Sequence, residues 1–420
     1  ATSQYDAIRA ALAGSVASGT ATLGASLTVA TITTTAHIGN NAQVNQEGGA
    51  ANQSVLVGAG TDYSSLGITG SVGFGLVAAA GFGGAALSPA LDINVVDLTT
   101  EAKIADDAFV DATKDITISA RSSQDIVTVA VGLAVSGGIT FGLSLAGSLS
   151  VVTMNNRTTA KIGKRSRVKA GGDLFVEASD ETDADIITGA GAFAAAPIGG
   201  SVGGALAVTP ITKRTEAFID QSATVETDGH LTSQATSSED IFTTSVSGSA
   251  GGLVGLAGAV AVNVIDSDTS AFIAEGANVT SKKSLSVVAS NEVDVVTGIG
   301  SVGLSLLGGL SGGVDVGIVR NDTSAFIGNG STINVSGSMA VLANSDIDVK
   351  SIVVSAAAGL VGLGGAASAY SIGGNLDSDA RDSITAQDGS GDTTASYADE
   401  QARGNAPLDL MGNYSANDAG

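Results

Sequence analysis

Two stretches of this sequence, TSAFIAEGANV at residues 269–279 and TSAFIGNGSTI at residues 323–333, are nearly the same and lie 54 residues apart. The third residue of the motif, an alanine, recurs along the chain at separations of 66, 58, 57, 54, 54 and 55 residues. A period that persists over most of the chain predicts a repeat architecture. The seven anchor alanines are Ala36, Ala102, Ala160, Ala217, Ala271, Ala325 and Ala380.

Apolar residues recur at every second position inside each repeat. In one repeat they are Ala271 and Ile273, followed after the turn residues AEG by Ala277 and Val279. In most repeats a polar or charged residue stands between the members of such a pair, such as Asn278 here and Lys103 or Lys161 in other repeats, which is typical of a strand with one buried face. Because like residues then stack repeat on repeat, the sequence predicts an all-β fold. We expect a parallel β-solenoid, or β-helix, of about six to seven repeats of 54–58 residues.

The last third of each repeat is apolar and uncharged, as in residues 186–211 and 241–265. These segments are long enough to cross a membrane as helices. Gly, Ser and Thr dilute their hydrophobicity, however, and turn signals such as PIGG and LLGGLSGG lie at their centres. We therefore predict Gly-rich apolar hairpins, or pairs of strands joined by a Gly-rich turn, and no membrane insertion. A short Gly/Ala helix per repeat and a multi-span membrane protein are the alternatives.

Three regions are expected along the chain. Residues 1–30 are predicted to hold a short N-terminal capping helix and entry strands, because Tyr5, Ile8 and Leu12 of SQYDAIRAAL share one helical face. Residues 31–385 form the β-solenoid repeat array. Residues 386–420 contain no Val or Ile and are rich in polar residues, which predicts a polar tail or an assembly arm.

Composition limits the function. The net charge of −23 repels phosphate backbones and anionic lipids, which disfavours nucleic-acid binding. The chain has no Cys, so disulfides, Cys-metal sites and thiol nucleophiles are excluded. Its two histidines, His37 and His230, lie in different repeats, so most Ser-His and general-base schemes lack a base. We expect no enzyme, no catalytic residue and no cofactor.

Carboxylates offer an alternative to that expectation. The segment DETDADI, with Asp180, Glu181, Asp183 and Asp185, could supply a carboxylate pair, although a solvated turn is the ordinary interpretation. Asp also recurs in equivalent places, which predicts a column about 10–14 Å apart if each repeat makes two or three coils. The members of the column are Asp125, Asp185, Asp240, Asp294 and Asp348.

Structural calcium is a second carboxylate hypothesis, because alternating Asp residues can offer oxygen ligands to a hard cation. The four candidates are Asp266 and Asp268 in IDSDTS and Asp377 and Asp379 in NLDSDA. The alternative is Asp at a turn or a strand edge, since the corresponding residues of other repeats read RND and MNNR.

Two further groups of residues are interface candidates. The position after the anchor alanine accepts His37 and Lys103 but also Phe218, Phe272 and Phe326, which predicts an exposed aromatic row that contacts another subunit. Burial of this row beneath the apolar hairpin is the alternative. The second group is a basic cluster that either lies on a solvent-exposed face of a strand or contacts an acidic surface of the next subunit. Its members are Lys161, Lys164, Arg165, Arg167 and Lys169.

The repeat pattern T-x-A-x-I-G-x-x-A-x-V, followed by a Gly-rich apolar run and AVAVNVIDSDT at residues 259–269, resembles the repeats of large bacterial filamentous adhesins. The leukotoxin-family filamentous adhesins and their filamentous-haemagglutinin-like relatives are the most similar in pattern, over roughly residues 30 to 385. The resemblance implies a secreted, surface-associated β-solenoid.

These observations together predict a non-enzymatic structural or adhesin-like protein on the bacterial cell surface. It would self-assemble head to tail into a filament, because heterologous contacts that do not close give open fibres. Copies of itself are the expected partners, with host or cell-surface glycans as further ones. The alternative is a carbohydrate-binding or polysaccharide-cleaving solenoid, which the absence of Trp and an aromatic content of 4% weaken.

Overall fold

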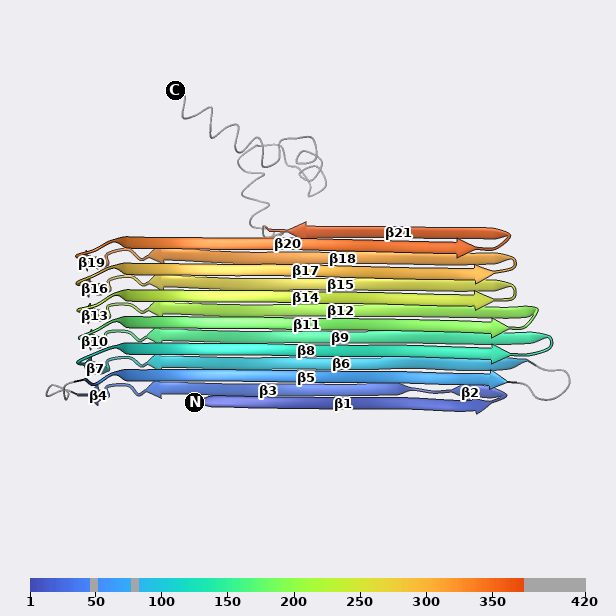
Figure 1. Cartoon of the computed structure of the whole chain (residues 1–420), viewed down its shortest axis with the longest axis horizontal. Helices are drawn as coiled ribbons and strands as arrows, with labels where there is room; N and C mark the ends of the chain where they lie inside the picture. The colour runs from blue at the N-terminus through green and yellow to red at the C-terminus, as the bar shows by residue number, and fades with distance from the viewer. Residues whose placement is uncertain (46–51, 77–82, 374–420) are drawn as a thin grey trace, which may run out of the picture. The chain divides into compact units, whose positions relative to one another are not determined.

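Three parallel sheets make up the part of the chain that this computed structural model describes, which is residues 1–45, 52–76 and 83–373 (Figure 1). Sheet A contains β1 (Thr2–Ala17), β5 (Val55–Leu76), β8 (Ile116–Gly137), β11 (Leu174–Ala195), β14 (Leu231–Gly251), β17 (Leu285–Ser305) and β20 (Met339–Ala358). Sheet B contains β2 (Gly19–Ala21), β3 (Gly24–Ile38), β6 (Gly84–Ile104), β9 (Phe141–Ile162), β12 (Ile198–Ile219), β15 (Val254–Ile273), β18 (Gly308–Ile327) and β21 (Val361–Ile372). Sheet C contains β4 (Gln43–Val44), β7 (Phe109–Ala112), β10 (Arg167–Ala170), β13 (Thr224–Thr227), β16 (Asn278–Ser281) and β19 (Thr332–Val335).

Each sequence repeat forms one coil of a parallel β-solenoid, which confirms the predicted fold class. The chain passes along sheet B, turns into sheet C, returns along sheet A and turns back into sheet B. The anchor alanines from Ala36 to Ala325 are direct register partners in successive coils, and Ala380 lies outside the described residues. The expectation of two or three coils per repeat was wrong, because one coil already uses two strands of about 20 residues.

In the coils from β8 onward, the apolar last third of the repeat is a pair of strands joined by a tight turn, as the sequence predicts. The pair differs from a hairpin in its hydrogen bonding. β11 pairs with β8 and β14 in sheet A, whereas β12 pairs with β9 and β15 in sheet B. The two strands therefore face each other across the interior, as an arch. Within the described residues, no helix has the length and apolar character to cross a membrane.

The predicted N-terminal helix was wrong. Residues Thr2–Ala17 form β1, which pairs with β5 from Thr2–Gly60 to Ala17–Gly75. The helical spacing of Tyr5, Ile8 and Leu12 misled the prediction, because in a strand Tyr5 and Ile8 point to opposite faces. Pairing with β5 supplies a long ladder of backbone hydrogen bonds, and this tertiary contact overrides the local helical pattern.

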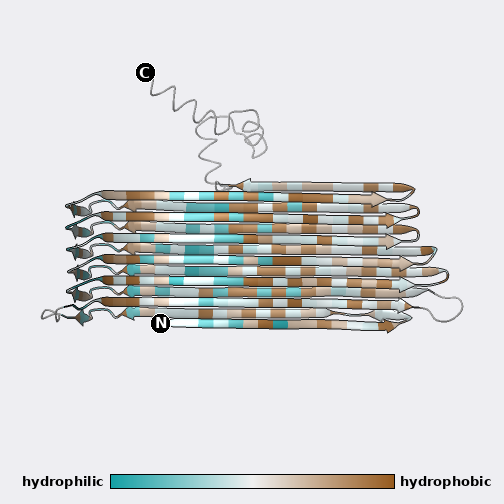
Figure 2. Cartoon of the chain, viewed as in Figure 1, coloured by the Kyte–Doolittle hydropathy of each residue, from teal (hydrophilic) through white to brown (hydrophobic). Residues whose placement is uncertain are grey.

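Hydropathy changes along the long strands at about the same level in every coil. Figure 2 shows apolar residues where the strands meet sheet C, then a polar band, then a long apolar stretch that ends at the arch turns. In β11 these parts are Leu174–Ala178, then residues 179–185, then residues 186–195. The polar band runs through all coils because the strands pair without a shift in register.

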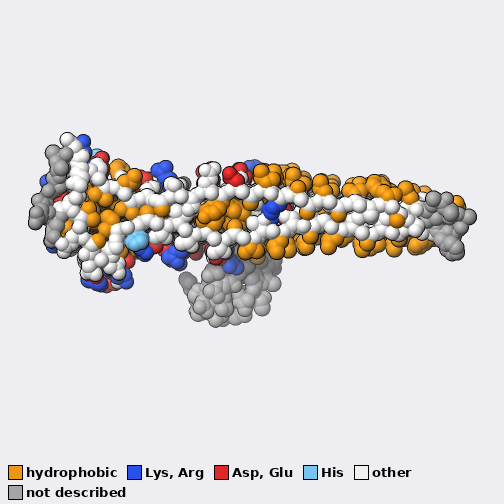
Figure 3. Space-filling view, turned by 90° about the horizontal axis from the view of Figure 1, so that it is seen from below, with side chains coloured by type: hydrophobic (Ala, Val, Ile, Leu, Met, Phe, Trp, Pro, Cys, Tyr) orange, Lys and Arg blue, Asp and Glu red, His pale blue; other side chains and the backbone are white. Residues whose placement is uncertain are grey.

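The solenoid is wide at the end with sheet C and narrow at the arch turns (Figure 3). We name the wide part the head. It encloses the three-sheet core and ends at the polar band. The narrow part, in which sheets A and B face each other, we name the blade. It comprises residues 126–153 of the coil formed by β8 and β9 and the residues in register with them.

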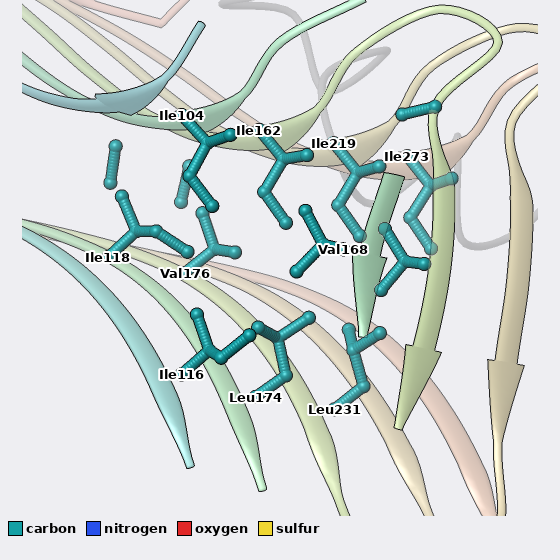
Figure 4. Packing of buried hydrophobic residues seen from close by; sticks show 14 of the residues in the cluster. Ile104, Ile116, Ile118, Ile162, Val168, Leu174, Val176, Ile219, Leu231 and Ile273 are labelled. Atoms are coloured by element: carbon teal, nitrogen blue, oxygen red, sulfur yellow. The ribbon is translucent and has the colours of Figure 1, made fainter. Parts of the chain in front are cut away.

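The head has an ordinary hydrophobic core. Columns of Ile, Val, Leu and Ala from the three sheets point inward and pack on the same residue of the neighbouring coil (Figure 4). The inward positions predicted from the sequence, Ala271, Ile273, Ala277 and Val279, are all at most 1% exposed. Each such stack removes apolar surface from water, which contributes about 25 cal/mol per Å².

The turn from sheet B to sheet C requires a left-handed residue in each coil. Ser222 has a φ of 56°, and Gly276 takes the same place in the next coil with a φ of 69°. The N–H of Ser222 donates to Glu275 O and that of Gly276 to Asn329 O, so the conformation is fixed by coil-to-coil bonds. Residues with a Cβ are strained there. The other left-handed residues in this column are Asn41, Asp107, Arg165 and Gly330.

Ser222→Gly should therefore stabilise the solenoid by about 0.5–1 kcal/mol, and Gly276→Ser should destabilise it by a similar amount. A Cβ on Gly276 would meet only Ser222 Oγ at 3.5 Å, so backbone strain and not crowding sets the effect. Urea denaturation of the two variants measures it. If both substitutions changed the free energy of unfolding equally and in the same direction, the requirement for a left-handed residue at this turn would be contradicted.

Candidate functional site

The predicted aromatic row is a stack on the outer face of sheet B, next to the turn into sheet C. Phe218 and Phe272 lie with ring centroids 4.7 Å apart and planes 5° apart, and Phe272 and Phe326 with centroids 4.9 Å apart and planes 2° apart. Phe326 is 45% exposed, and the other two rings are half-buried by their neighbours. The stack is thus a flat apolar strip, and its role as an interface stays a prediction.

Charged residues continue the same column beyond the rings. Lys161 Nζ lies 5.9 Å from the Phe218 ring centroid and 3.1 Å from Glu101 Oε1. Lys103 contacts the other Glu101 oxygen at 2.7 Å. Burial acts to raise the pKa of Glu101, but the hydrogen bonds from Lys103 and Lys161 outweigh it and lower the pKa. The strip therefore ends in a paired, half-buried ion cluster.

The basic cluster is divided by acidic neighbours. Arg165 makes a bidentate contact with Asp107, at 2.8 and 2.7 Å, in the preceding coil. Arg167 and Lys169 are exposed on β10, and Lys169 has Asp111 and Glu226 as its register partners on either side. Lys164 is half-buried at the turn. This surface alternates in sign, so it is a set of local pairs and only partly a basic patch.

The predicted Asp column lies on the outer face of sheet A, but one of its predicted members is wrong. Asp183, and not Asp185, is the register partner of Asp125 and Asp240. The residues are one coil apart, so they stand at about the 4.8 Å strand spacing and not at 10–14 Å. Partial burial, and then the charges of Asp185, Asp240 and Asp125, raise the pKa of Asp183. The column ends at Asp348, which Lys350 contacts at 2.6 Å.

The carboxylates of DETDADI do not form a pair in one place. Asp180 points inward, and Asp183 points outward. Asp180 is fully buried and belongs to an ion triad: Lys213 Nζ lies 2.8 Å from Asp180 Oδ1 and 2.9 Å from Glu239 Oε1. The three side chains come from β11, β12 and β14, and each is 0% exposed. This triad was not predicted from the sequence.

The environment of the triad explains how the interior holds these charges. Asp180 accepts hydrogen bonds from Asn156 at 2.5 Å and Thr158 at 2.7 Å. Burial raises the pKa of Asp180, and Lys213 opposes that rise. Burial acts to lower the pKa of Lys213, but the two carboxylates outweigh it and raise the pKa. Most other coils place neutral hydroxyl and amide groups at this level, so the triad is one segment of a longer polar seam.

The calcium candidates within the described part of the chain face arginines. Asp266 lies 3.9 Å from Arg320, and Asp268 lies 3.6 Å from Arg214. Among the described residues, no three His, Cys, Asp or Glu side chains gather closely enough to hold a metal ion. Asp377 and Asp379 lie outside the described residues.

A shallow polar groove of about 770 Å³ crosses the outer face of sheet A in the head. Arg121, Glu177, Glu181 and Gln234 are among its lining residues, and Arg121 lies 3.9 Å from Glu177. The stack around Phe272 is on sheet B, so the groove and the aromatic strip lie on different sheets. Carbohydrate binding would draw on both aromatic rings and carboxylates, and this arrangement keeps them apart.

The blade has the reverse of the ordinary alternation. Next to the polar band its inward residues still include large ones such as Ile126 and Ile186, but toward the arch turns they are small, such as Ala192 and Ser201, which are at most 1% exposed. Its outward residues are large and apolar, such as Phe193 at 44% and Val202 at 37% exposed. Figure 3 shows apolar side chains along both outer faces of the blade. Contiguous exposed apolar surface of this kind usually marks an interaction site.

Lys213→Met should destabilise the solenoid by about 3–5 kcal/mol, because it leaves Asp180 and Glu239 buried without a counter-charge. The triple variant Lys213→Ser, Asp180→Ser, Glu239→Thr should recover most of the loss. It installs the residues found at these positions in neighbouring coils, which are Ser267, Ser237 and Thr182. Chemical denaturation measures the free energy of unfolding of the unmodified chain and the two variants. A Lys213→Met chain as stable as the unmodified one would contradict the role given to the triad.

Asp183→Asn should stabilise the fold at pH 7 by about 0.5 kcal/mol, since like charges on adjacent strands oppose pairing. Because the pKa of Asp183 is raised, its protonated form stabilises the fold at pH values below about 3.9, the pKa of Asp in the unfolded chain. This stabilisation is lost as the pH rises through the pKa that Asp183 has in the folded state. The gain should therefore vanish at pH 3. Asp348→Asn is the matched control, since it removes the partner of Lys350 and should give no gain. Urea denaturation at both pH values measures the difference.

No protein-family model, no curated protein and no solved structure matches this chain.

Proposed function

We propose that this chain is a non-enzymatic structural protein, an adhesin-like β-solenoid of the bacterial cell surface that lengthens by end-to-end addition of coils from further copies. The observation that carries the proposal is the state of the last coil. Met339 is 56% exposed and Val341 37%, whereas their register partners Leu285 and Val287 are at most 1% exposed. Within the described residues, core positions of the last coil thus remain uncovered.

The backbone of the last coil supports the same proposal. In the interior coils the N–H of an inward sheet A residue donates to the following coil, as Leu231 does to Ser284 O at 2.9 Å and Leu285 to Ser338 O at 3.0 Å. The equivalent donors of β20 are directed at an edge that no described strand covers. An open edge of this length is a template for pairing with another chain.

The coils are uniform enough to continue across such a junction. Strands of sheet A pair over nearly their full lengths, and no shift in register accumulates between β5 and β20. The contact between the two ends is heterologous, so it generates an open fibre. The resemblance of the repeats to bacterial filamentous adhesins supports an extracellular location, and the net charge of −23 supports partners other than nucleic acids.

Ala343→Pro tests the proposal. Ala343 lies on the same face of β20 as Met339, so its N–H points to the open edge, and its loss removes no bond to another described residue. Proline is tolerated at such an edge position. We expect the variant to fold as the unmodified chain does, while electron microscopy and sedimentation show fibres replaced by short species.

Asn344→Pro is the matched control, one residue away. Outward residues of sheet A donate to the preceding coil, as Gly60 does to Ala1 O at 2.8 Å, so this variant loses a bond to β17 and should loosen the last coil. Fibres that persist unchanged in Ala343→Pro, or an unmodified chain that stays single at every concentration, would overturn end-to-end assembly.

A further inference from the structure

The outer face of sheet B in the blade carries ridges that run along the stacking axis. One residue of each strand contributes to a ridge of large apolar side chains, of which Leu145, Val202 and Leu310 are 36%, 37% and 40% exposed. A second ridge lies four residues further along each strand. The first ridge is Leu87, Leu145, Val202, Leu256 and Leu310, and the second is Leu91, Leu149, Leu206, Val260 and Val314.

A glycine groove separates these ridges. Gly147, Gly204, Gly258 and Gly312 are direct register partners in four successive coils. A Cβ added to Gly204, Gly258 or Gly312 would meet no atom within 4 Å, and none of the four has a positive φ. The fold of the single chain therefore does not need glycine here. Since glycine weakens a strand interior, its repetition marks close approach of another surface.

We propose that the sheet B face of the blade binds the same face of a second copy of this chain. A ridge and a groove lie side by side on one face, so the surface is complementary to itself. A two-fold axis parallel to the stacking direction, midway between the Leu145 ridge and the Gly147 groove, places the ridge of each copy in the groove of the other. Such a contact is isologous and closes as a pair.

The limits of the apolar face fit this arrangement. In β9 the outward apolar residues extend from Phe141 to Val151, and the axis between Leu145 and Gly147 lies at the centre of that stretch. The two blades then overlap over the whole apolar face, with strands antiparallel and heads at opposite ends. The polar residues that follow, such as Asn155 and its register equivalents Asp266 and Arg320, fall beyond the partner's arch turns.

The area is sufficient for a stable pair. Six strands at about 4.8 Å, each contributing eleven residues at about 3.3 Å, give a face of roughly 1,000 Å² per copy. A standard protein interface buries about 800 Å² per partner.

A second copy fits this face better than lipid acyl chains do. Lipid would surround the open edges of the first and last blade strands, and unpaired backbone groups are not tolerated in hydrocarbon. A face-to-face pair leaves these edges in water or free for further coils. Disordered acyl chains would also pack no better against a face with a glycine groove at a constant position. The ridge of a second copy has the same spacing and fills that groove.

The test fills the groove without disturbing the fold. Gly204→Val with Gly258→Val adds side chains into open space on strands that favour Val, so thermal unfolding should be unchanged or improved. The control is Gly248→Val, which adds the same side chain on the outer face of sheet A, also into open space. All variants are made in the Ala343→Pro chain, so that lateral pairing is measured apart from end-to-end association.

Sedimentation velocity measures the pairing, and flotation with phosphatidylcholine vesicles measures lipid binding. We expect the groove-filled variant to dissociate at least tenfold more readily than the Ala343→Pro chain, with the Gly248→Val control unchanged. Equal pairing in all three chains would overturn the proposal. A second result would also overturn it: the Ala343→Pro chain stays single and floats with vesicles, and the two valines increase its flotation. That result would assign the face to lipid.

Discussion

Parallel pairing of every coil with the next in the same register is the constraint on which the rest of this structure depends. It fixes the face of each residue by its parity along the strand, and it places each residue on its equivalent one coil away, as Ala217 on Ala271. Such stacking favours apolar and aromatic columns, including the rings of Phe272 and Phe326. It also brings carboxylates together, so the Asp183 column is compatible with the fold only where water screens it.

The same constraint explains how the interior changes along one coil. In the head three sheets leave space for Ile and Leu, so Ile219 and Leu231 point inward and are fully buried. In the blade only two sheets face each other, and inward Ala, Ser and Gly let them approach closely. The buried Lys213 triad lies between these regions, where β12 can satisfy a long side chain with carboxylates from β11 and β14.

Much of the head could be predicted from the sequence, because the period near 54 residues and the alternation around Ile273 are local signals. The blade could not be predicted in the same way. Extending the inward parity of Leu174 without a break would have placed Phe193 outside and Ala192 inside, as observed. A single bulge would have reversed that assignment, and a one-residue shift moves every side chain to the other face. The partners of Lys213 lie in two other strands, so their meeting depends on the fold.

An open strand edge and an apolar face make different demands on the chain. An edge needs backbone partners at one coil spacing, and it is satisfied only by another coil added along the stacking axis. The apolar face of sheet B needs a partner that excludes water from its side chains. Without the glycines, any flat apolar surface could be that partner. The column from Gly147 to Gly312 restricts that face to partners with a matching ridge. Because ridge and groove both follow the stacking axis, each coil added along that axis lengthens the lateral contact by one step. The proposed growth at the edge and the proposed pairing of the faces are therefore compatible, and each would strengthen the other as coils accumulate.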